Sequence, residues 1–347
     1  MFGKIFDRFR KDISIDLGTA NTLVYVKNRG IVINEPSVVA VNTRTEQILA
    51  VGNEAKEMLG KTPPHILTTR PLVNGIISDF EVTEKMLRYF IDKVYENSMN
   101  FMTRPRVIIG APLDITEVER KAINDAAVNA GAREVIIVEE PMAAAIGARM
   151  PIREPVGNFI VEIGGGTTEI AVISLSGIVT WKSIPIAGDE LNRNIVQYAR
   201  DAFNLLLGEK QAEEIKIKIG SAIEWSEPMQ FPMRGRDLVT GLPKEVMIGE
   251  SQVREAITKS LRAIIDNIKA TLEITPPELV ADIHERGILL SGGGALLRGL
   301  DQLISRAAEI PVRIADDPLT SVVRGGGILL DEHDLLSEIS TTSNKKS

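Results

Sequence analysis

The chain lacks cysteine altogether and contains only three histidines, His65, His284 and His333, among its 347 residues. The absence of cysteine excludes a disulfide framework, thiolate zinc sites and cysteine nucleophiles, and it is typical of a protein of the reducing cytosol. None of the histidines has a second histidine at the spacing of metal ligands, so a metal–histidine site is not expected. We interpret all three as ordinary surface residues.

Long apolar runs are also missing. No segment approaches the roughly 18 apolar residues of a membrane-spanning helix, and charges interrupt the apolar residues at the start of the chain, so neither a span nor a signal peptide is expected. The sequence has 40 Lys and Arg against 47 Asp and Glu, a formal net charge of -7. This acidic balance argues against a nucleic-acid partner. The length favours about two domains with a substantial core.

The first twelve residues differ from the rest of the chain in charge and in aromatic content. They hold four basic and two acidic side chains, a charge of +2, so the remaining residues carry -9. Phe2, Ile5, Phe6 and Phe9 recur at the spacing of one helix face. The pattern predicts an amphipathic helix over 1–12 that lies on the inner face of the cytoplasmic membrane, with avidity strengthening a weak single anchor. The alternative is a helix that docks on its own domain.

A second candidate membrane contact lies in the loop over residues 98–105. Its sequence, SMNFMTRP, places Met99, Phe101 and Met102 close together. The alternative interpretation, equally weighted, is ordinary packing of these side chains under the neighbouring helix.

The chain contains an internal repeat. Residues 13–33 and 159–180 share one plan: an apolar strand, an acidic residue, a tight turn with glycine, a hydroxyl or amide residue, and two further strands joined at a glycine. Asp16 and Glu162 correspond at an offset of 146 residues, and Gly30 and Gly177 at an offset of 147. The repeat predicts two related halves of mixed α/β architecture, each opening with a β-meander.

Three glycine-containing turns that follow apolar strands are the candidate phosphate-binding elements. They span residues 16–21, 162–167 and 291–295. Glycine lets backbone N–H groups approach a polyphosphate because no Cβ intervenes. One such turn usually serves geometry alone, but two copies at repeated positions, each preceded by a carboxylate, favour a phosphate clamp that meets Mg²⁺ mostly through its waters. No P-loop or dinucleotide-binding glycine pattern follows a strand here.

Seven ordered segments resemble the actin superfamily, and most closely the MreB family of bacterial actin homologues. The resemblance covers nearly all of residues 12–330 and implies a duplicated, ribonuclease H-like α/β fold with two domains, four subdomains and ATP between the halves. The segments are IDLGTANT (15–22), NEPSVVA (34–40), EEPMAAAIGA (139–148), IGGGTTE (163–169), EEIKIKIGSA (213–222), LSGGGALLRGL (290–300) and ADDPL (315–319).

The resemblance also implies domain boundaries. After the helix over 1–12, subdomain IA would comprise 13–32, 76–145 and 316–336, and subdomain IB 33–75. Subdomain IIA would comprise 146–181 and 246–315, and subdomain IIB 182–245. Residues 337–347 form a polar tail that we expect to be disordered.

The family's site residues carry over to matching positions of this chain. Asp16, Glu140 and Thr167 are the expected catalytic residues: the resemblance implies that Glu140 orients the attacking water and that Thr167 assists. An alternative role for Glu140 is to cap the helix expected to start at Pro141. Asp16 and Glu162 would meet Mg²⁺ through water molecules. The expected nucleotide contacts are Gly18, Thr19, Ala20 and Asn21; Gly164, Gly165 and Gly166; Glu213, Glu214, Ile215 and Lys216; and Gly293, Gly294, Ala295 and Leu296.

One position departs from the family pattern. The second phosphate turn of the family usually begins with Asp, whereas this chain has Glu162, whose side chain is one methylene longer. We expect ATP to bind but the metal geometry, and with it hydrolysis, to be altered.

The resemblance implies a membrane-associated, ATP-dependent filament that shapes the cell by organising wall synthesis, with RodZ, MreC and MreD as partners. Self-association into filaments and a cytoplasmic location, peripheral on the membrane, follow from it, with weak ATPase activity. Two alternatives stay open. One is a nucleotide-binding filament with little or no turnover, and the other is a soluble small-molecule kinase of the same fold.

Overall fold

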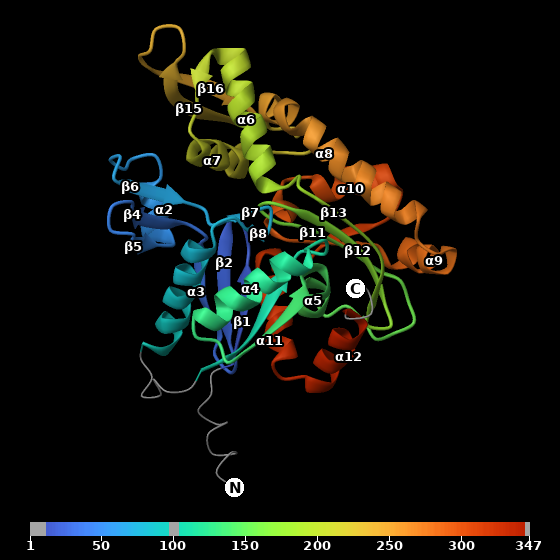
Figure 1. The fold of residues 1–347 in the computed structure, drawn as a ribbon. Helices are drawn as coiled ribbons and strands as arrows, with labels where there is room; N and C mark the ends of the chain where they lie inside the picture. The colour runs from blue at the N-terminus through green and yellow to red at the C-terminus, as the bar shows by residue number, and fades with distance from the viewer. Residues whose placement is uncertain (1–11, 97–103, 344–347) are drawn as a thin grey trace. The chain divides into compact units, whose positions relative to one another are not determined.

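The computed structural model describes residues 12–96 and 104–343, with the side chains of 340–343 left aside (Figure 1). The expected membrane contacts Phe2, Ile5, Phe6, Phe9, Met99, Phe101 and Met102 therefore lie outside the described residues. The chain divides into two compact units. Unit 1 comprises Met1–Pro155, Ile173–Ile178 and Leu319–Ser347, and unit 2 comprises Val156–Val172 and Val179–Pro318. No helix of the described residues is long and apolar enough to cross a bilayer.

Unit 1 is built on a five-stranded sheet with the order β10-β9-β1-β2-β3. Strands β1, β2 and β3 form an antiparallel meander, whereas β1, β9 and β10 run parallel. The strands are β1 (Ile13–Leu17), β2 (Asn21–Val26), β3 (Gly30–Pro36), β9 (Arg106–Ala111) and β10 (Glu134–Glu139).

Helices cover the two faces of this sheet. Ile13, Ile15 and Leu17 alternate along β1 and pack into one buried cluster with α3 (Phe80–Tyr95) and α4 (Glu117–Asn129). The opposite face meets α11 (Ser321–Leu329), which crosses α5 (Glu140–Gly147). The two helices approach so closely that a methyl group on Gly147 or on Gly325 would overlap the backbone of the other helix.

The remaining elements of unit 1 are small. The three-stranded sheet β5-β4-β6 and the hairpin β7-β8 follow the meander, and α12 follows α11. The tail predicted to be disordered from residue 337 differs from the structure, in which α12 continues to Ser343 because Leu335, Leu336 and Ile339 are buried. These elements are β4 (Val39–Asn42), β5 (Ile48–Val51), β6 (Ile66–Thr69), β7 (Leu72–Val73), β8 (Ile76–Ile77), α2 (Asn53–Met58) and α12 (His333–Ser343).

Unit 2 repeats the sheet of unit 1. Its strand order is β13-β12-β11-β17-β18, and β11, β17 and β18 run parallel. Each strand of unit 2 thus takes the place of a strand of unit 1, so the duplication predicted from the sequence is confirmed. The strands are β11 (Asn158–Ile163), β12 (Thr168–Ser174), β13 (Gly177–Ile184), β17 (Ile288–Ser291) and β18 (Val312–Ile314).

Helices and a second small sheet complete unit 2. Phe159, Val161 and Ile163 of β11 share one buried cluster with α6, α7, α8 and α10. Helix α6 ends at Phe203, because Asn204 takes a left-handed conformation at φ 50° and Leu205 pairs with Asp237. The elements are α6 (Gly188–Phe203), β14 (Leu205–Leu206), α7 (Glu209–Ile219), β15 (Gln230–Asp237), β16 (Pro243–Gly249), α8 (Glu250–Glu273), α9 (Pro277–Arg286), α10 (Leu300–Ala308) and the 3₁₀ helices η1 (Gly293–Leu296) and η2 (Pro318–Thr320).

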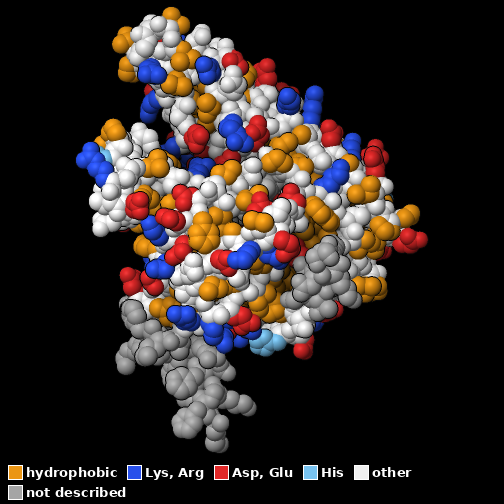
Figure 2. All heavy atoms as spheres, in the orientation of Figure 1, with side chains coloured by type: hydrophobic (Ala, Val, Ile, Leu, Met, Phe, Trp, Pro, Cys, Tyr) orange, Lys and Arg blue, Asp and Glu red, His pale blue; other side chains and the backbone are white. Residues whose placement is uncertain are grey.

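The surface carries mixed charge. On the face drawn in Figure 2, Lys and Arg side chains are interspersed with Asp and Glu. Apolar side chains gather at the tip of the β15–β16 hairpin, where Leu238, Val239 and Leu242 are exposed.

Candidate functional site

The first acidic turn lies at the end of β1. Asp16 alternates with Ile15 and Leu17, so its side chain points to the sheet face that α11 covers and not to the α3–α4 cluster. The residue is half-buried, and desolvation raises the pKa of the Asp16 carboxyl to about 7. A nearby cation would favour the charged form and lower this pKa again. A positive partner would therefore stabilise the ionised form of the Asp16 carboxyl.

Hydrogen bonds fix the backbone of the turn that follows Asp16. Ser37 Oγ donates to the Gly18 carbonyl over 2.6 Å, and Ser37 N donates to the Ala20 carbonyl over 3.0 Å. Thr19 is buried, and its Oγ1 accepts from Gly75 N over 2.8 Å. The predicted contact residues Gly18, Thr19 and Ala20 thus form a turn that is held from two sides.

Glu140 lies at the same sheet edge as Asp16. Asp16 is level with Gly110 on β9, and Gly110 is level with Val138 on β10, which ends one residue before Glu140. Only 7% of Glu140 is exposed, and the residue lies against Gly110. Helix α5 begins at Glu140 with Glu139 as its N-cap, so the capping alternative for Glu140 is wrong.

The second acidic turn lies between β11 and β12. Gly164 N donates to the Thr167 carbonyl over 2.9 Å, and Thr167 and Gly166 are buried. The first amides of α6 hold the turn: Gly188 N donates to the Gly164 carbonyl over 3.2 Å, and Asp189 N donates to the Gly165 carbonyl over 2.8 Å. The start of α6 at Gly188 was not predicted, although a glycine followed by two acids before an amphipathic stretch signals a helix N-terminus.

In unit 2, Glu162 occupies the position that Asp16 has in unit 1. The residue is 5% exposed and is level with Ser291 of the neighbouring parallel strand. Its carboxylate lies against Gly292, which has φ +79°, and a methyl group there would overlap both that carboxylate and the Ile163 carbonyl. Gly292 therefore makes room for the longer side chain. The sequence places Gly292 in the glycine-containing turn over 291–295, but the expected nucleotide contacts began only at Gly293.

Helix α7 reaches the second turn through one lysine. Lys216 Nζ donates to the Gly188 carbonyl over 2.8 Å, next to the residues that hold Gly164. Glu213, one helical turn before Lys216, is half-buried, and Glu214 is exposed. Ile215 is fully buried in the hydrophobic core of unit 2. Its side chain therefore packs α7 against the core and does not lie on the face of α7 that carries Lys216.

The third glycine-rich turn continues from β17 into η1. Gly293 and Leu296 are exposed, Gly294 is half-buried, and Ala295 is buried. Gly292 N donates to the Pro318 carbonyl over 2.9 Å, which fixes the start of this turn. Gly292 also joins it to Glu162, so unit 2 brings its two glycine-rich turns together.

The acidic residues do not form a closed metal cage. Within 12–96 and 104–343 there is no group of three or more His, Cys, Asp or Glu side chains that could hold a metal ion. A single carboxylate at each turn suits a hydrated Mg²⁺ that takes its other ligands from phosphates and water. Asp16, with its raised pKa, and Glu162 fit such an ion chemically. Each of the two acidic turns offers one carboxylate beside a rigid, glycine-rich backbone.

Comparison with known proteins agrees with this arrangement. Residues 10–338 match the family model described as MreB/Mbl protein. The chain is 48% identical over 328 residues to the cell shape-determining protein Mbl of Bacillus cereus, which covers 94% of this chain and 98% of the relative. It is 49% identical over 339 residues to the cell shape-determining protein MreB of Escherichia coli K12, covering 96% and 97%.

Solved structures give the same result for the fold. The crystal structure of MreB5 of Spiroplasma citri bound to ADP matches with a TM-score of 0.89 and 39% identity, covering 95% of this chain and 98% of that one. The MamK double helical filament matches with a TM-score of 0.78 at 22% identity, over 93% of this chain and 99% of that one, which supports the fold alone. The chain therefore has the actin-like fold and belongs to the MreB/Mbl family.

Proposed function

We propose that this chain is an ATP-dependent cytoskeletal filament protein that controls cell shape by organising cell-wall synthesis at the membrane. The observation that carries the proposal is the repeated acidic turn, which ends the first strand of both five-stranded sheets. Two relatives bear the name cell shape-determining protein, and MreB5 of Spiroplasma citri has been solved with ADP and with AMPPNP. These findings support a nucleotide as the ligand of the turns and a role in determining cell shape.

The proposed chemistry is in-line attack of water on the γ-phosphate of ATP. Glu140, buried at the sheet edge that also carries Asp16, would orient the water, with Thr167 assisting. The amides of the glycine turns would hold the phosphates, while Glu213 and Lys216 would meet the ribose and base. Asp16 and Glu162 would hold Mg²⁺ through its waters, and the ion would supply charge neutralisation at the phosphates.

Glu162 favours a second candidate, a filament protein with little ATP turnover. Its carboxylate lies against the Gly292 backbone, a place that the shorter Asp side chain of the family pattern would not reach in the same way. A soluble small-molecule kinase is the less favoured alternative, because the MreB/Mbl family model takes up residues 10–338.

Electron microscopy of the purified chain with ATP, with ADP and without nucleotide tests the proposed function. We expect filaments with ATP and fewer or none in the other two conditions, because the nucleotide would favour assembly. If filaments form in no condition, both filament proposals are contradicted. Filaments that form equally in all three conditions would contradict ATP dependence.

Phosphate release by the Glu162→Asp variant tests the role of the longer side chain. We expect the variant to release phosphate faster than the wild type, by roughly tenfold, since small displacements of groups at a reacting centre change rates by such factors. Glu273→Asp, at the exposed end of α8, shortens a glutamate remote from the turns and should leave the rate unchanged. Equal rates for wild type and Glu162→Asp would contradict the idea.

Membrane association is part of the proposal and rests on the sequence. The apolar face of the helix predicted over 1–12, together with its basic residues, suits a surface of anionic lipid. Met99, Phe101 and Met102 remain a predicted second contact, and RodZ, MreC and MreD remain partners predicted from the family resemblance.

Co-sedimentation with anionic lipid vesicles tests the membrane proposal. Replacing Phe2, Ile5 and Phe6 with Glu should reduce the bound fraction by about tenfold or more, because both apolar area and favourable charge are lost. A charge-matched control replaces the exposed residues Leu67, Val118 and Val239 with Glu and should keep wild-type binding. Unchanged binding of the first variant would refute the anchor.

A further inference from the structure

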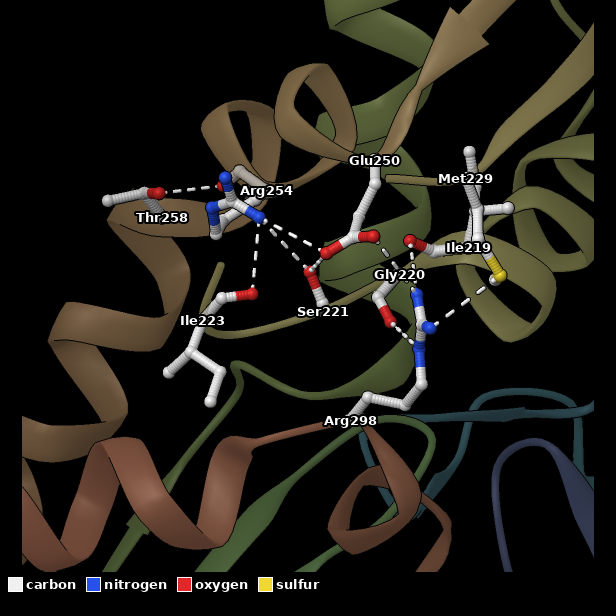
Figure 3. A network of polar contacts seen from close by, with 9 residues as sticks. All are labelled: Ile219, Gly220, Ser221, Ile223, Met229, Glu250, Arg254, Thr258 and Arg298. Carbon is white, nitrogen blue, oxygen red and sulfur yellow. Dashed lines mark hydrogen bonds and ion pairs between the residues drawn. The ribbon is translucent and has the colours of Figure 1, made fainter. Parts of the chain in front are cut away.

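A buried carboxylate lies at the centre of a polar network in unit 2 (Figure 3). Glu250 is the first residue of α8, and only 2% of it is exposed. Ser221 Oγ donates to Glu250 Oε1 over 2.7 Å, and Arg254 Nη1 lies 3.3 Å from the same oxygen. Arg298 Nη2 lies 3.7 Å from the other carboxylate oxygen. Two arginines and a helix N-terminus thus compensate one buried negative charge.

Arg298 connects this network to the end of α7. Its Nε donates to the Gly220 carbonyl over 3.2 Å, and its Nη2 donates to the Ile219 carbonyl over 3.1 Å. These carbonyls belong to the last residue of α7 and to its C-cap, where a helix has no partners of its own for its carbonyls and a cation is favourable. A planar guanidinium satisfies both carbonyls at once, which an ammonium group cannot do in the same geometry.

Further contacts fix Arg298 from other sides. Ala222 N donates to the Arg298 carbonyl over 2.8 Å, and Ser221 and Arg298 form an isolated parallel bridge. The Arg298 guanidinium also lies 5.8 Å from the centre of the Trp225 ring, and its Nη1 donates weakly to Met229 Sδ over 3.8 Å. The backbone and side chain of Arg298 therefore tie the α7 end to the segment between η1 and α10.

Both of the segments that Arg298 joins carry expected nucleotide contacts. Arg298 follows Leu296, the last residue of η1, by two positions. On the other side, α7 carries Glu213 and also Lys216, which donates to Gly188 beside the second turn. The guanidinium of Arg298 is directed at the α7 carbonyls, so it would act on the ligand through these segments and not by direct contact.

We propose that Arg298 is a positioning residue that holds α7 and η1 at the separation required by the adenosine part of the nucleotide. The inference rests on the proposed function, and it assigns the network a role in affinity for the nucleoside. Within the described residues, the side-chain hydrogen bonds and the ion pair of Arg298 go to Ile219, Gly220, Met229 and Glu250, and none goes to the two acidic turns. Binding of the phosphates alone should therefore not depend on Arg298.

The test compares two ligands by isothermal titration calorimetry, MgATP and magnesium tripolyphosphate. Arg298→Met keeps most of the side-chain length but removes the guanidinium. We expect its affinity for MgATP to fall by about tenfold, the effect of losing roughly one hydrogen bond to a charged group. Its affinity for tripolyphosphate should equal that of the wild type. A purely structural role would lower both affinities together, and that result would overturn the proposal.

Arg254→Met is the matched control, because it removes the other arginine beside Glu250 but leaves the α7 carbonyls paired. It should keep both wild-type affinities even if its unfolding temperature falls. Arg298→Lys keeps the charge and should bind ATP with intermediate affinity, and it carries the test if Arg298→Met does not fold.

The outcomes separate the inference from the proposed function. A wild type that binds no ATP overturns both. A wild type that binds ATP, with Arg298→Met and Arg298→Lys binding it equally well, overturns the positioning role alone.

Discussion

Parallel pairing of three strands in each unit is the constraint on which the candidate site depends. In unit 1, β1, β9 and β10 end at one edge of the sheet, and this edge carries Asp16, Gly110 and Glu140. Parallel strands place their carboxyl ends together, so residues far apart in the sequence become neighbours. In unit 2, the same pairing of β11 with β17 places Glu162 level with Ser291. The same parallel pairing, present in both units, therefore places each acidic turn beside residues from a distant part of the chain.

The alternation of side chains along the first strand adds the second constraint. Residues on either side of the acid are apolar and enter the helix-covered core, so the acid itself must face the other way. For Asp16, this placement is accompanied by desolvation that raises its pKa to about 7. The core that stabilises each unit thereby also sets the direction of its carboxylate.

Much of this could be predicted from the sequence, because the signals are local. The apolar strand, the acid and the glycine turn appear together in both halves, and their repetition predicts the duplicated sheet. Glu140 could be placed after a strand and at a helix start, although its position relative to the N-cap was wrong by one residue.

The rest depends on contacts between distant segments. Gly188, Gly292 and Arg298 matter because of where α6, η1 and α7 lie in the fold, and no local pattern in the sequence encodes those neighbours. Ile215 illustrates the reverse error: it lies within a motif of expected nucleotide contacts, but helical periodicity turns its side chain into the core.

In the proposed function, the ionised carboxylate of Asp16 receives the magnesium nucleotide. The most direct measurement is the affinity of the wild type for MgATP between pH 6 and pH 8, with Mg²⁺ in excess. With a pKa of about 7 in the ligand-free protein, the ionised fraction of Asp16 rises from about one tenth to about nine tenths across this range, so the affinity should increase by about tenfold. An affinity that stays constant, or that falls as the pH rises, would contradict the account.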